Sequence, residues 1–293
     1  MDDLKNIRTL CTPGSGFSVS TVQVEFREDF NMKSHPLYRR HVNEVWDNKM
    51  KNCSNLFNAT KFRLHDTILK DISNPCLNNL TFQIGVTCYK DFIGTNCAPY
   101  ADELHRDGLK DYQNPQAYMA DPIGVGAILI TTNDDTIFMR RSENCAEMPL
   151  MIDRPGGHPE PDVVTNESNQ DIKHCQPSRI CEEVFDSVLK EIRDEINVPL
   201  ECLSQPILLG IDYNPDTWRR PLLEFIVRCS LSTYEVQELY QQQTQAESEE
   251  STELIVVELT KLIDNDFKNT EIYRKFTHAA KTAICLLKIF LSK

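Results

Sequence analysis

Residues 182–198, EEVFDSVLKEIRDEINV, constrain the fold of this chain most, because they combine dense negative charge with an apolar repeat. At about 100° per residue, one side of a helix collects the apolar series Phe185, Val188, Leu189, Ile192 and Ile196. Another side collects the acids Glu183, Glu191, Asp194 and Glu195. The pattern predicts a helix from about Ile180 to Ile196, with one face packed in a core and the other strongly negative.

The acidic face itself points to a cation. Carboxylates four residues apart on a helix, as Glu191 and Glu195 are, repel each other unless a positive charge lies between them. Hard oxygen ligands in this number suit Mg²⁺, with Mn²⁺ as a second possibility. A metal held there would neutralise pyrophosphate charge and activate a water molecule, which favours hydrolysis of a phosphoanhydride. The other interpretation of the charge run alone is a solvated helix face.

Composition narrows the classes of partner. The 31 basic and 44 acidic side chains give a net charge of -13, which argues against nucleic acid as a ligand. The 11 cysteines are odd in number, irregularly spaced and without a CxxC pair, so we expect free thiols in a reducing compartment. The N-terminus lacks the pattern of a signal peptide, and no apolar run reaches the ~18 residues of a membrane span. These features predict a soluble, cytoplasmic protein without membrane contact.

Polar, turn-rich sequence at 107–116 predicts a boundary between an N-terminal domain, residues 1–117, and a second domain, residues 118–293. The first has strand-like runs at 20–26 and 80–89 and a helical stretch at 35–50. In the second, the runs 124–132 and 136–141 are spaced as a hairpin, and 151–161 form a Gly/Pro loop.

The rest of the second domain alternates between helical and strand-like patterns. We expect strands at 205–213, 222–231 and 253–260, and helices at 231–243 and 270–291. Residues 162–179 are polar and unpatterned, which predicts a long insertion or surface loop, and 244–252 predict a solvated acidic loop. Interleaved strands and helices indicate an α/β class.

The acidic helix resembles the second part of the Nudix signature, GX5EX7REUXEEXGU, in which U is aliphatic. Glu191, Ile192, Glu195 and Val198 match it, Lys190 stands for Arg and Asp194 for Glu. Asn197 stands for Gly and can adopt the same left-handed conformation.

The first part of the signature is split from the second. Its Gly corresponds best to Gly157, which lies 33 positions before Lys190 rather than 14, so the resemblance implies a 19-residue insertion. Glu182 takes the first acidic position, but Glu183 shares the helix face of Glu191 and could supply the extra carboxylate.

Segments between about residues 55 and 200 also resemble one branch of the superfamily, the UDP-glucose pyrophosphatases. They include LFNATKFRLH, TCYKDFIGTN, QAYMADPIGVGA and RRSENCAEMPLMIDRPGGHPEP. This resemblance implies a Nudix α/β/α sandwich with a smaller N-terminal α/β domain and a dependence on Mg²⁺. It also implies a small-molecule nucleotide sugar as substrate, with UDP-glucose or UDP-galactose hydrolysed to UMP and a sugar 1-phosphate.

Carried over by position, the resemblance implies a set of substrate contacts, namely Phe57, Tyr89, Arg141, Ala146, Asp153, His158 and Glu160. Two aromatic rings could stack on uracil, although either could be a core residue. Arg141 could donate two parallel hydrogen bonds to oxygen atoms of the diphosphate. The two acids could accept from hydroxyls or reach the metal, and the histidine could donate to a phosphate, or be an ordinary loop residue.

The resemblance also implies that Glu191 and Glu195 hold the metal, with Asp194 as a further catalytic acid. Ala279 could close the substrate pocket. Glu224 is either a further catalytic carboxylate or an exposed residue on an edge strand.

Three alternatives remain open at this point. The first keeps the enzyme class and changes the substrate to ADP-ribose, another nucleotide sugar or a dinucleoside polyphosphate. The second is a Nudix-derived module that binds a nucleotide or a protein without cleaving it, motivated by the altered signature. The third, an acidic metal-buffering protein, is disfavoured because no EF-hand loop occurs.

Overall fold

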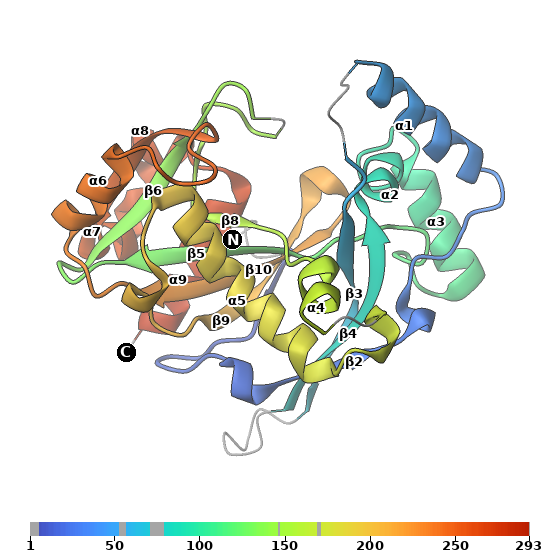
Figure 1. The fold of residues 1–293 in the computed structure, drawn as a ribbon, viewed down its shortest axis with the longest axis horizontal. Helices are drawn as coiled ribbons and strands as arrows, with labels where there is room; N and C mark the ends of the chain where they lie inside the picture. Colours follow the sequence, from blue (N-terminus) through green and yellow to red (C-terminus); the bar gives the residue numbers. More distant parts are fainter. Residues whose placement is uncertain (1–5, 53–56, 71–78, 146, 169–170, 293) are drawn as a thin grey trace.

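The computed structural model describes residues 6–52, 57–70, 79–145, 147–168 and 171–292 (Figure 1). In chain order its strands are β1 (Ile7–Thr9), β2 (Val22–Phe26), β3 (Thr60–Lys70), β4 (Asn79–Cys88), β5 (Gly124–Ile130), β6 (Asp135–Arg141), β7 (Ile152–Asp153), β8 (Gly156–Gly157), β9 (Ile207–Asn214), β10 (Arg220–Arg228) and β11 (Ser251–Glu258). The helices are α1 (Arg39–Asn52), α2 (Tyr89–Gly94), α3 (Ala101–Tyr112), α4 (Pro161–Ser168), α5 (Pro177–Ile196), α6 (Thr233–Gln241), α7 (Leu259–Ile263), α8 (Glu271–Arg274) and α9 (His278–Leu291).

A large mixed sheet has the strand order β1-β9-β10-β5-β6-β11, with β7 added to β6 and β8 added to β5. The central pair β5 and β10 is parallel, and the other pairs are antiparallel. Because both faces of a sheet with a parallel centre are covered, its middle strand can be apolar throughout. All seven residues of β5 are buried.

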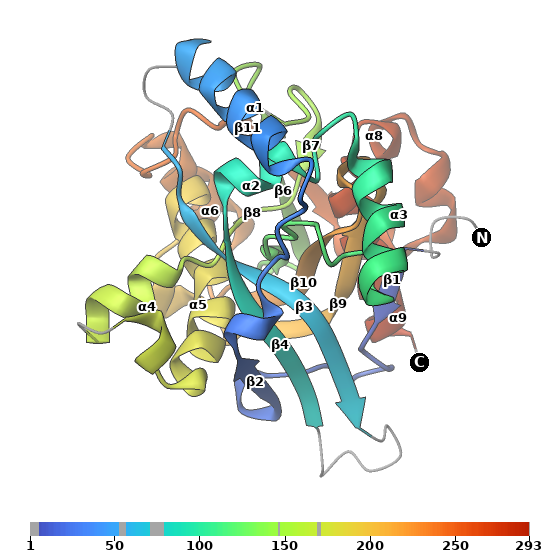
Figure 2. The ribbon, with the colours of Figure 1, turned by 90° about the vertical axis from the view of Figure 1, so that its right-hand side faces the viewer.

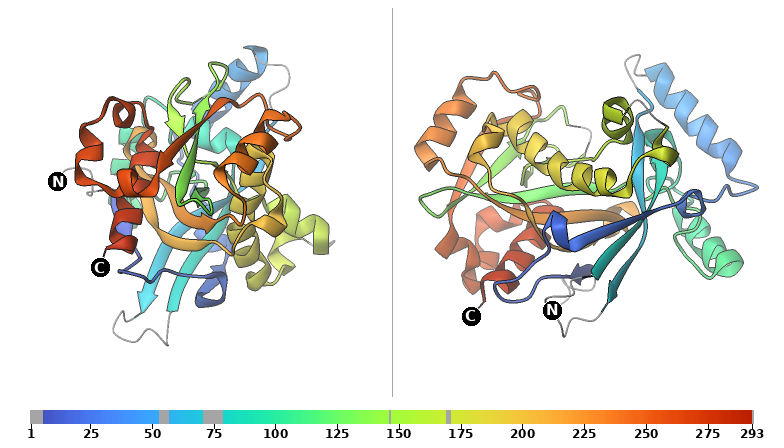
Figure 3. Two further views of the ribbon diagram at one scale, coloured as in Figure 1. Left: turned by 90° about the vertical axis from the view of Figure 1, so that its left-hand side faces the viewer. Right: turned by 60° about the horizontal axis from the view of Figure 1, so that its bottom comes forward.

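Helices cover both faces of this sheet. Val125, Ala127 and Leu129 of β5 point into a core shared with α5, whereas Ile128 and Ile130 point into a second core shared with α9. Figure 3 shows α5 on one side of the sheet and α9 on the other. The predicted α/β/α sandwich is therefore confirmed.

A smaller sheet, in the order β2-β4-β3, stands beside α5 (Figure 2). Its apolar side chains, such as Phe62 and Phe82, are fully buried and belong to the same core as α5. The helices α1, α2 and α3 lie on the other side of this sheet from α4 and α5 (Figure 1). The N-terminal α/β part is thus joined to the sandwich through a common core.

The first strand of the N-terminal segment does not lie in the small sheet. β1 pairs with β9 at one edge of the large sheet, so the chain starts in one sheet and continues into the other. The division at 117/118 remains a prediction.

Two predicted elements were wrong in detail. The interval 162–179, expected to be a loop, contains most of α4 and the first residues of α5, because side chains such as Val164 and Cys175 are buried against the core. The helix expected at 270–291 is broken into α8 and α9, since Thr277 serves as the N-cap of α9. None of the helices in the described residues is long and apolar enough to span a membrane.

Candidate metal and nucleotide site

The acidic helix forms as the sequence predicts. Pro177 occupies the first helical turn, where a missing N–H is tolerated, and the apolar series packs into the core. At the other end Asn197 adopts φ 72°, the left-handed conformation expected there, and its N–H donates to the Arg193 carbonyl. The side chain of Asn197 also donates to the Leu239 carbonyl, which ties the end of α5 to α6.

The Gly/Pro loop lies directly on the acidic face of α5. The N–H of Gly156 donates to Glu195 Oε2 at 2.9 Å, and the N–H of His158 donates to Glu191 Oε1 at 3.3 Å. A Cβ on Gly157 would lie 2.0 Å from Glu191 Oε1, so a larger residue here would displace this carboxylate from its position against the loop. The structure therefore joins the two parts of the signature across the insertion.

Two further acids join the cluster from a distant loop. Ligand atoms of Glu195, Glu247 and Glu250 all lie within 4.8 Å of one another. The loop that carries them is fixed by the Glu247 N–H, which donates to the Asp194 carbonyl at 2.8 Å. Sequence reasoning missed both residues, because the run ESEES looks like any solvated acidic loop.

Electrostatics show that this cluster lacks positive charge. Burial raises the pKa of Glu195 well above its ordinary value, and Glu191 and Glu247 raise it further. Burial and the charge of Glu247 raise the pKa of Glu191 to about 8. In the described part of the chain, Glu191, Glu195, Glu247 and Glu250 form no ion pair with a basic side chain. Crowded oxygen donors without a cationic partner fit a divalent metal ion.

The other acids of α5 have different surroundings. Glu183 is buried, accepts from the Glu160 N–H and pairs with Lys190 Nζ at 2.6 Å. Glu182 is partly exposed and pairs with Arg179. Glu183 thus contacts the loop, and its role as an extra carboxylate of the metal site remains a prediction. Asp194 turns its carboxylate to Arg193, at 2.7 Å.

Beneath the Gly/Pro loop lies a buried network of paired charges. Arg154 donates to Glu224 at 2.7 and 3.0 Å and lies 3.3 Å from Asp153. A Cβ on Gly126 would lie 2.3 Å from the Arg154 guanidinium carbon, so this glycine leaves the space that the arginine fills. Glu224 is fully buried on the central strand β10, so the exposed-edge interpretation of it was wrong.

Asp153 and Arg141 lie at the margin of this network. Asp153 accepts from the Thr277 hydroxyl at 2.8 Å, and Arg141 Nη1 is 3.9 Å from Asp153. Ala279, the second residue of α9, is 8% exposed. Their predicted contacts with substrate remain predictions.

Basic side chains surround His158. Its pKa is lowered well below the ordinary value by burial and then by the charges of Arg220, Lys61 and Arg154. The neutral ring can therefore donate or accept one hydrogen bond. Lys61 pairs with Glu160 at 2.7 Å, and Arg220 pairs with Glu147 at 3.0 Å. Sequence reasoning missed Lys61 and Arg220, which lie on other strands.

The predicted nucleobase contacts come from adjoining segments. The Tyr89 N–H donates to the Ala59 carbonyl at 3.0 Å, which holds the start of α2 against the segment after Phe57. Phe57 is 70% exposed, and no ring contact joins it to Tyr89 among the described residues. Tyr89 instead lies edge-on to Trp46, with ring centroids 6.3 Å apart. Ala146 lies outside the described residues.

Comparisons with known proteins give clear relatives. The chain is 38% identical over 286 residues to the uridine diphosphate glucose pyrophosphatase NUDT22 of Mus musculus, which covers 98% of this chain and 91% of that protein. It is 37% identical over 274 residues to the protein of that name from Homo sapiens, covering 94% and 89%. It is 30% identical over 257 residues to Nudix hydrolase 9 of Arabidopsis thaliana, covering 85% and 81%.

A search against models of protein families gives no match. Among solved structures, the MutT protein from Methanosarcina mazei Go1 is 16% identical and covers 55% of this chain and 88% of that one, with a TM-score of 0.33. A TM-score this low carries no argument about function.

Proposed function

Because this chain belongs to the Nudix hydrolase family, we propose that it hydrolyses the pyrophosphate bond of UDP-glucose or UDP-galactose, with Mg²⁺ as the metal ion. Water adds to one phosphorus atom, the bridging P–O bond breaks, and the products are UMP and the sugar 1-phosphate. One observation carries this proposal, namely the acidic face of α5, where the carboxylates of Glu191 and Glu195 lie near those of Glu247 and Glu250 and have no basic partner in the described part of the chain.

Residues of this chain would perform the metal-dependent part of the reaction as follows. Glu195 and Glu191 would hold the metal ion, and Glu247 and Glu250 would offer further oxygen ligands from the loop before β11. When bound, Mg²⁺ supplies charge neutralisation at the diphosphate and an activated water. The N–H groups of Gly156 and His158 keep the two helix carboxylates in place.

Substrate binding follows from the groups around the loop. The charges of Arg220 and Lys61 act on the neutral His158 of the Gly/Pro loop, and this positive charge and a hydrogen bond from His158 would orient the diphosphate. We assign Arg141 to the same diphosphate, and Asp153 and Glu160 to hydroxyl groups of the ligand.

We assign uracil to Phe57 and Tyr89. Stacking of an aromatic ring on a base contributes about 1–3 kcal/mol. The exposed ring of Phe57 leaves one face available to a ligand. Ala146 and Ala279 complete the proposed set of substrate contacts.

The partner in this proposal is a small nucleotide sugar, and the acidic surface argues against nucleic acid. We propose a cytoplasmic location, which the odd number and irregular spacing of the 11 cysteines favour.

The test is product analysis in oxygen-18 water with UDP-glucose, UDP-galactose and ADP-ribose as substrates. We expect UMP and sugar 1-phosphate only when Mg²⁺ is present, with the heavy oxygen in one of the two. Rapid turnover of ADP-ribose with negligible UMP from UDP-glucose would overturn the substrate. Binding without release of any monophosphate would instead support the non-catalytic alternative.

A further inference from the structure

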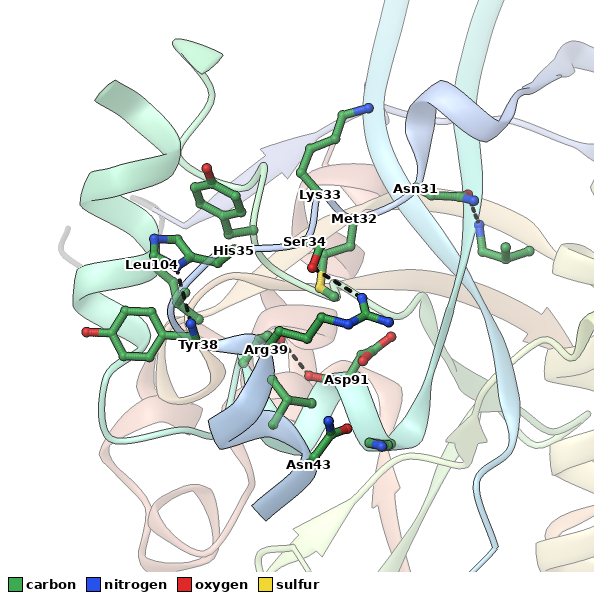
Figure 4. A pocket seen from close by; sticks show the side chains of 15 residues that line it. Asn31, Met32, Lys33, Ser34, His35, Tyr38, Arg39, Asn43, Asp91 and Leu104 are labelled. Carbon is green, nitrogen blue, oxygen red and sulfur yellow. Dashed lines mark hydrogen bonds between the residues drawn. The ribbon is translucent and has the colours of Figure 1, made fainter. Parts of the chain in front are cut away.

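A cavity lies in the N-terminal part (Figure 4), among the helices α1, α2 and α3 that Figure 1 shows on the side of the small sheet away from α5. Its volume is about 310 Å³, within the lower range of small-molecule sites. The walls come from the segment 31–35, here called the strap, and from β4, α1, α2 and α3. None of the residues proposed for the catalytic site lines it.

The cavity carries positive charge in a strongly acidic protein. Three basic side chains, Lys33, Arg39 and Lys90, line it, against the single carboxylate of Asp91. Within the described residues, none of the three basic side chains forms an ion pair with a carboxylate. Lys33 Nζ donates to the Asp29 carbonyl and Arg39 Nη1 to the Ser34 hydroxyl, each at 3.2 Å. The formal charge of the lining is therefore about +2, in a chain of net charge -13.

The rest of the lining suits an organic group. Met32, Val42, Val86 and Leu104 provide apolar surface. Figure 4 shows Arg39 reaching across the cavity between the strap and Asp91. The Asp91 carboxylate can accept from a ligand hydroxyl, and the basic groups can bind an anion.

The cavity is held open by hydrogen bonds that fix the strap. Asn31 Oδ1 accepts from the Val86 N–H at 2.7 Å, and the Lys33 N–H donates to the Ala117 carbonyl at 2.8 Å. A Cβ on Gly85 would lie 2.6 Å from Asn31 Oδ1, so the strap depends on glycine there. His35 is also fixed, by Asp107 at 3.1 Å. A fixed cavity loses little entropy when a ligand binds.

We propose that this cavity binds a small organic phosphate monoester, of the size of a sugar phosphate or a nucleoside monophosphate. A phosphate monoester carries about -1.5 to -2 charges at pH 7, which matches the lining. The hydroxyl-bearing remainder lies against Asp91 and the apolar wall.

Helix α2 connects this cavity to the proposed catalytic site. Lys90 and Asp91 line the cavity, whereas Tyr89, the preceding residue, is our candidate for stacking on uracil. Phe92 of the same helix lies under Arg220, with 5.1 Å from the guanidinium carbon to the ring centroid. A ligand that shifts α2 therefore changes the affinity of the catalytic site, and this consequence rests on the proposed function.

The test uses the full-length protein without metal, and calorimetric titration with glucose 1-phosphate, UMP and inorganic phosphate. We compare the wild type with Arg39→Glu/Lys90→Glu. The matched control is Arg40→Glu, which changes the next residue of α1, an exposed side chain paired with Glu44 outside the cavity. We expect the double variant to weaken binding by roughly tenfold or more, and the control to leave it near the wild-type value.

Tighter binding of UMP or of glucose 1-phosphate identifies the organic part of the ligand. The proposal is overturned if inorganic phosphate binds as tightly as both monoesters, or if the double variant binds like Arg40→Glu. Arg39→Gln/Lys90→Gln repeats the comparison without charge reversal, in case the first variant folds poorly. UDP-glucose hydrolysis is measured separately, so its absence would count against the proposed function alone.

Discussion

The acids on α5 and the acids beneath the Gly/Pro loop differ in what balances their charge. Beneath the loop, Glu224 and Asp153 share the guanidinium of Arg154, and Asp212 lies 3.1 Å from His278. On α5, Glu191 and Glu195 face Glu247 and Glu250, with no basic partner in the described part of the chain.

This difference separates a structural role from a ligand-binding one. A buried charge needs compensation, and in the network around Arg154 the chain supplies it. On α5 the compensation has to come from outside the chain, as protons when metal is absent and as a metal ion when it is present. Burial raises the pKa of both Glu191 and Glu224, to about 8 and about 7, but only Glu224 has a basic partner, Arg154, in the described part of the chain.

The largest expected effect is on catalysis. Glu195→Gln should lower kcat for UDP-glucose by about 10³-fold or more, because it removes the charge of a proposed metal ligand. The fold should persist, since burial and then the charge of Glu191 raise the pKa of Glu195, so a neutral amide is favoured at this position. Steady-state rates with saturating Mg²⁺ measure the first effect, and thermal unfolding the second. Glu182→Gln, on the exposed side of α5, is the control. Similar rates in both variants would show that Glu195 is not a metal ligand.

The next effect concerns stability. Arg154→Met should reduce the free energy of unfolding by about 3–5 kcal/mol, because it leaves Glu224 buried without its partner. Urea unfolding measures the change, and Arg154→Met/Glu224→Gln should recover part of it. The control is Arg179→Met, which breaks an exposed pair and should have a much smaller effect. Equal losses of unfolding free energy in Arg154→Met and Arg179→Met would show that the buried ion pair stabilises the fold no more than the exposed one.

A smaller effect on activity is expected from the loop acids. Glu247→Gln should weaken the apparent affinity for Mg²⁺ by about 10–100-fold, as loss of a supporting metal contact does. Glu249→Gln is a matched control, because Glu249 is exposed on the same loop but is not part of the cluster. Activity measured against Mg²⁺ concentration distinguishes the two. An unchanged Mg²⁺ dependence in Glu247→Gln would instead support the sequence-based prediction of a solvated acidic loop at residues 244–252.

The smallest effect is a pH-dependent gain in melting temperature when metal is added. The folded-state pKa of Glu191 is about 8, against an ordinary 4.5, so the folded state binds its proton more tightly than the unfolded state. The stability that this proton gives the metal-free protein is complete below pH 4.5 and is lost as the pH rises through 8. Metal replaces the proton, so Mg²⁺ should raise Tm by about 5 °C more at pH 8.5 than at pH 6.

Thermal unfolding with and without Mg²⁺ at both pH values measures this difference. Glu191→Gln should flatten it, because that variant has no proton to lose. A gain in Tm that is equal at both pH values in the wild type would contradict the assignment of the raised pKa to this cluster.

Local patterns in the sequence predicted several elements of the structure correctly. The 3.6-residue repeat predicted α5, the apolar run at 124–130 predicted β5, and left-handed Asn197 followed from its place at the helix end. Glu191 and Glu195 were identified because a single helix holds both of them. These features depend on residues that are close together in the chain, so they can be predicted from the sequence alone.

Only tertiary structure brought Glu247 and Glu250 to α5, placed Lys61 and Arg220 around His158, and paired β1 with β9. In the sequence, the acids of residues 244–252 cannot be distinguished from solvated acids. Only the fold places a second acidic surface, that of α5, against them. Charge and hydrophobicity along the chain determined which side chains favour burial in a core and which favour contact with a cation. The packing of distant segments decided which carboxylates face one another, because Coulomb repulsion and burial depend on distance in space.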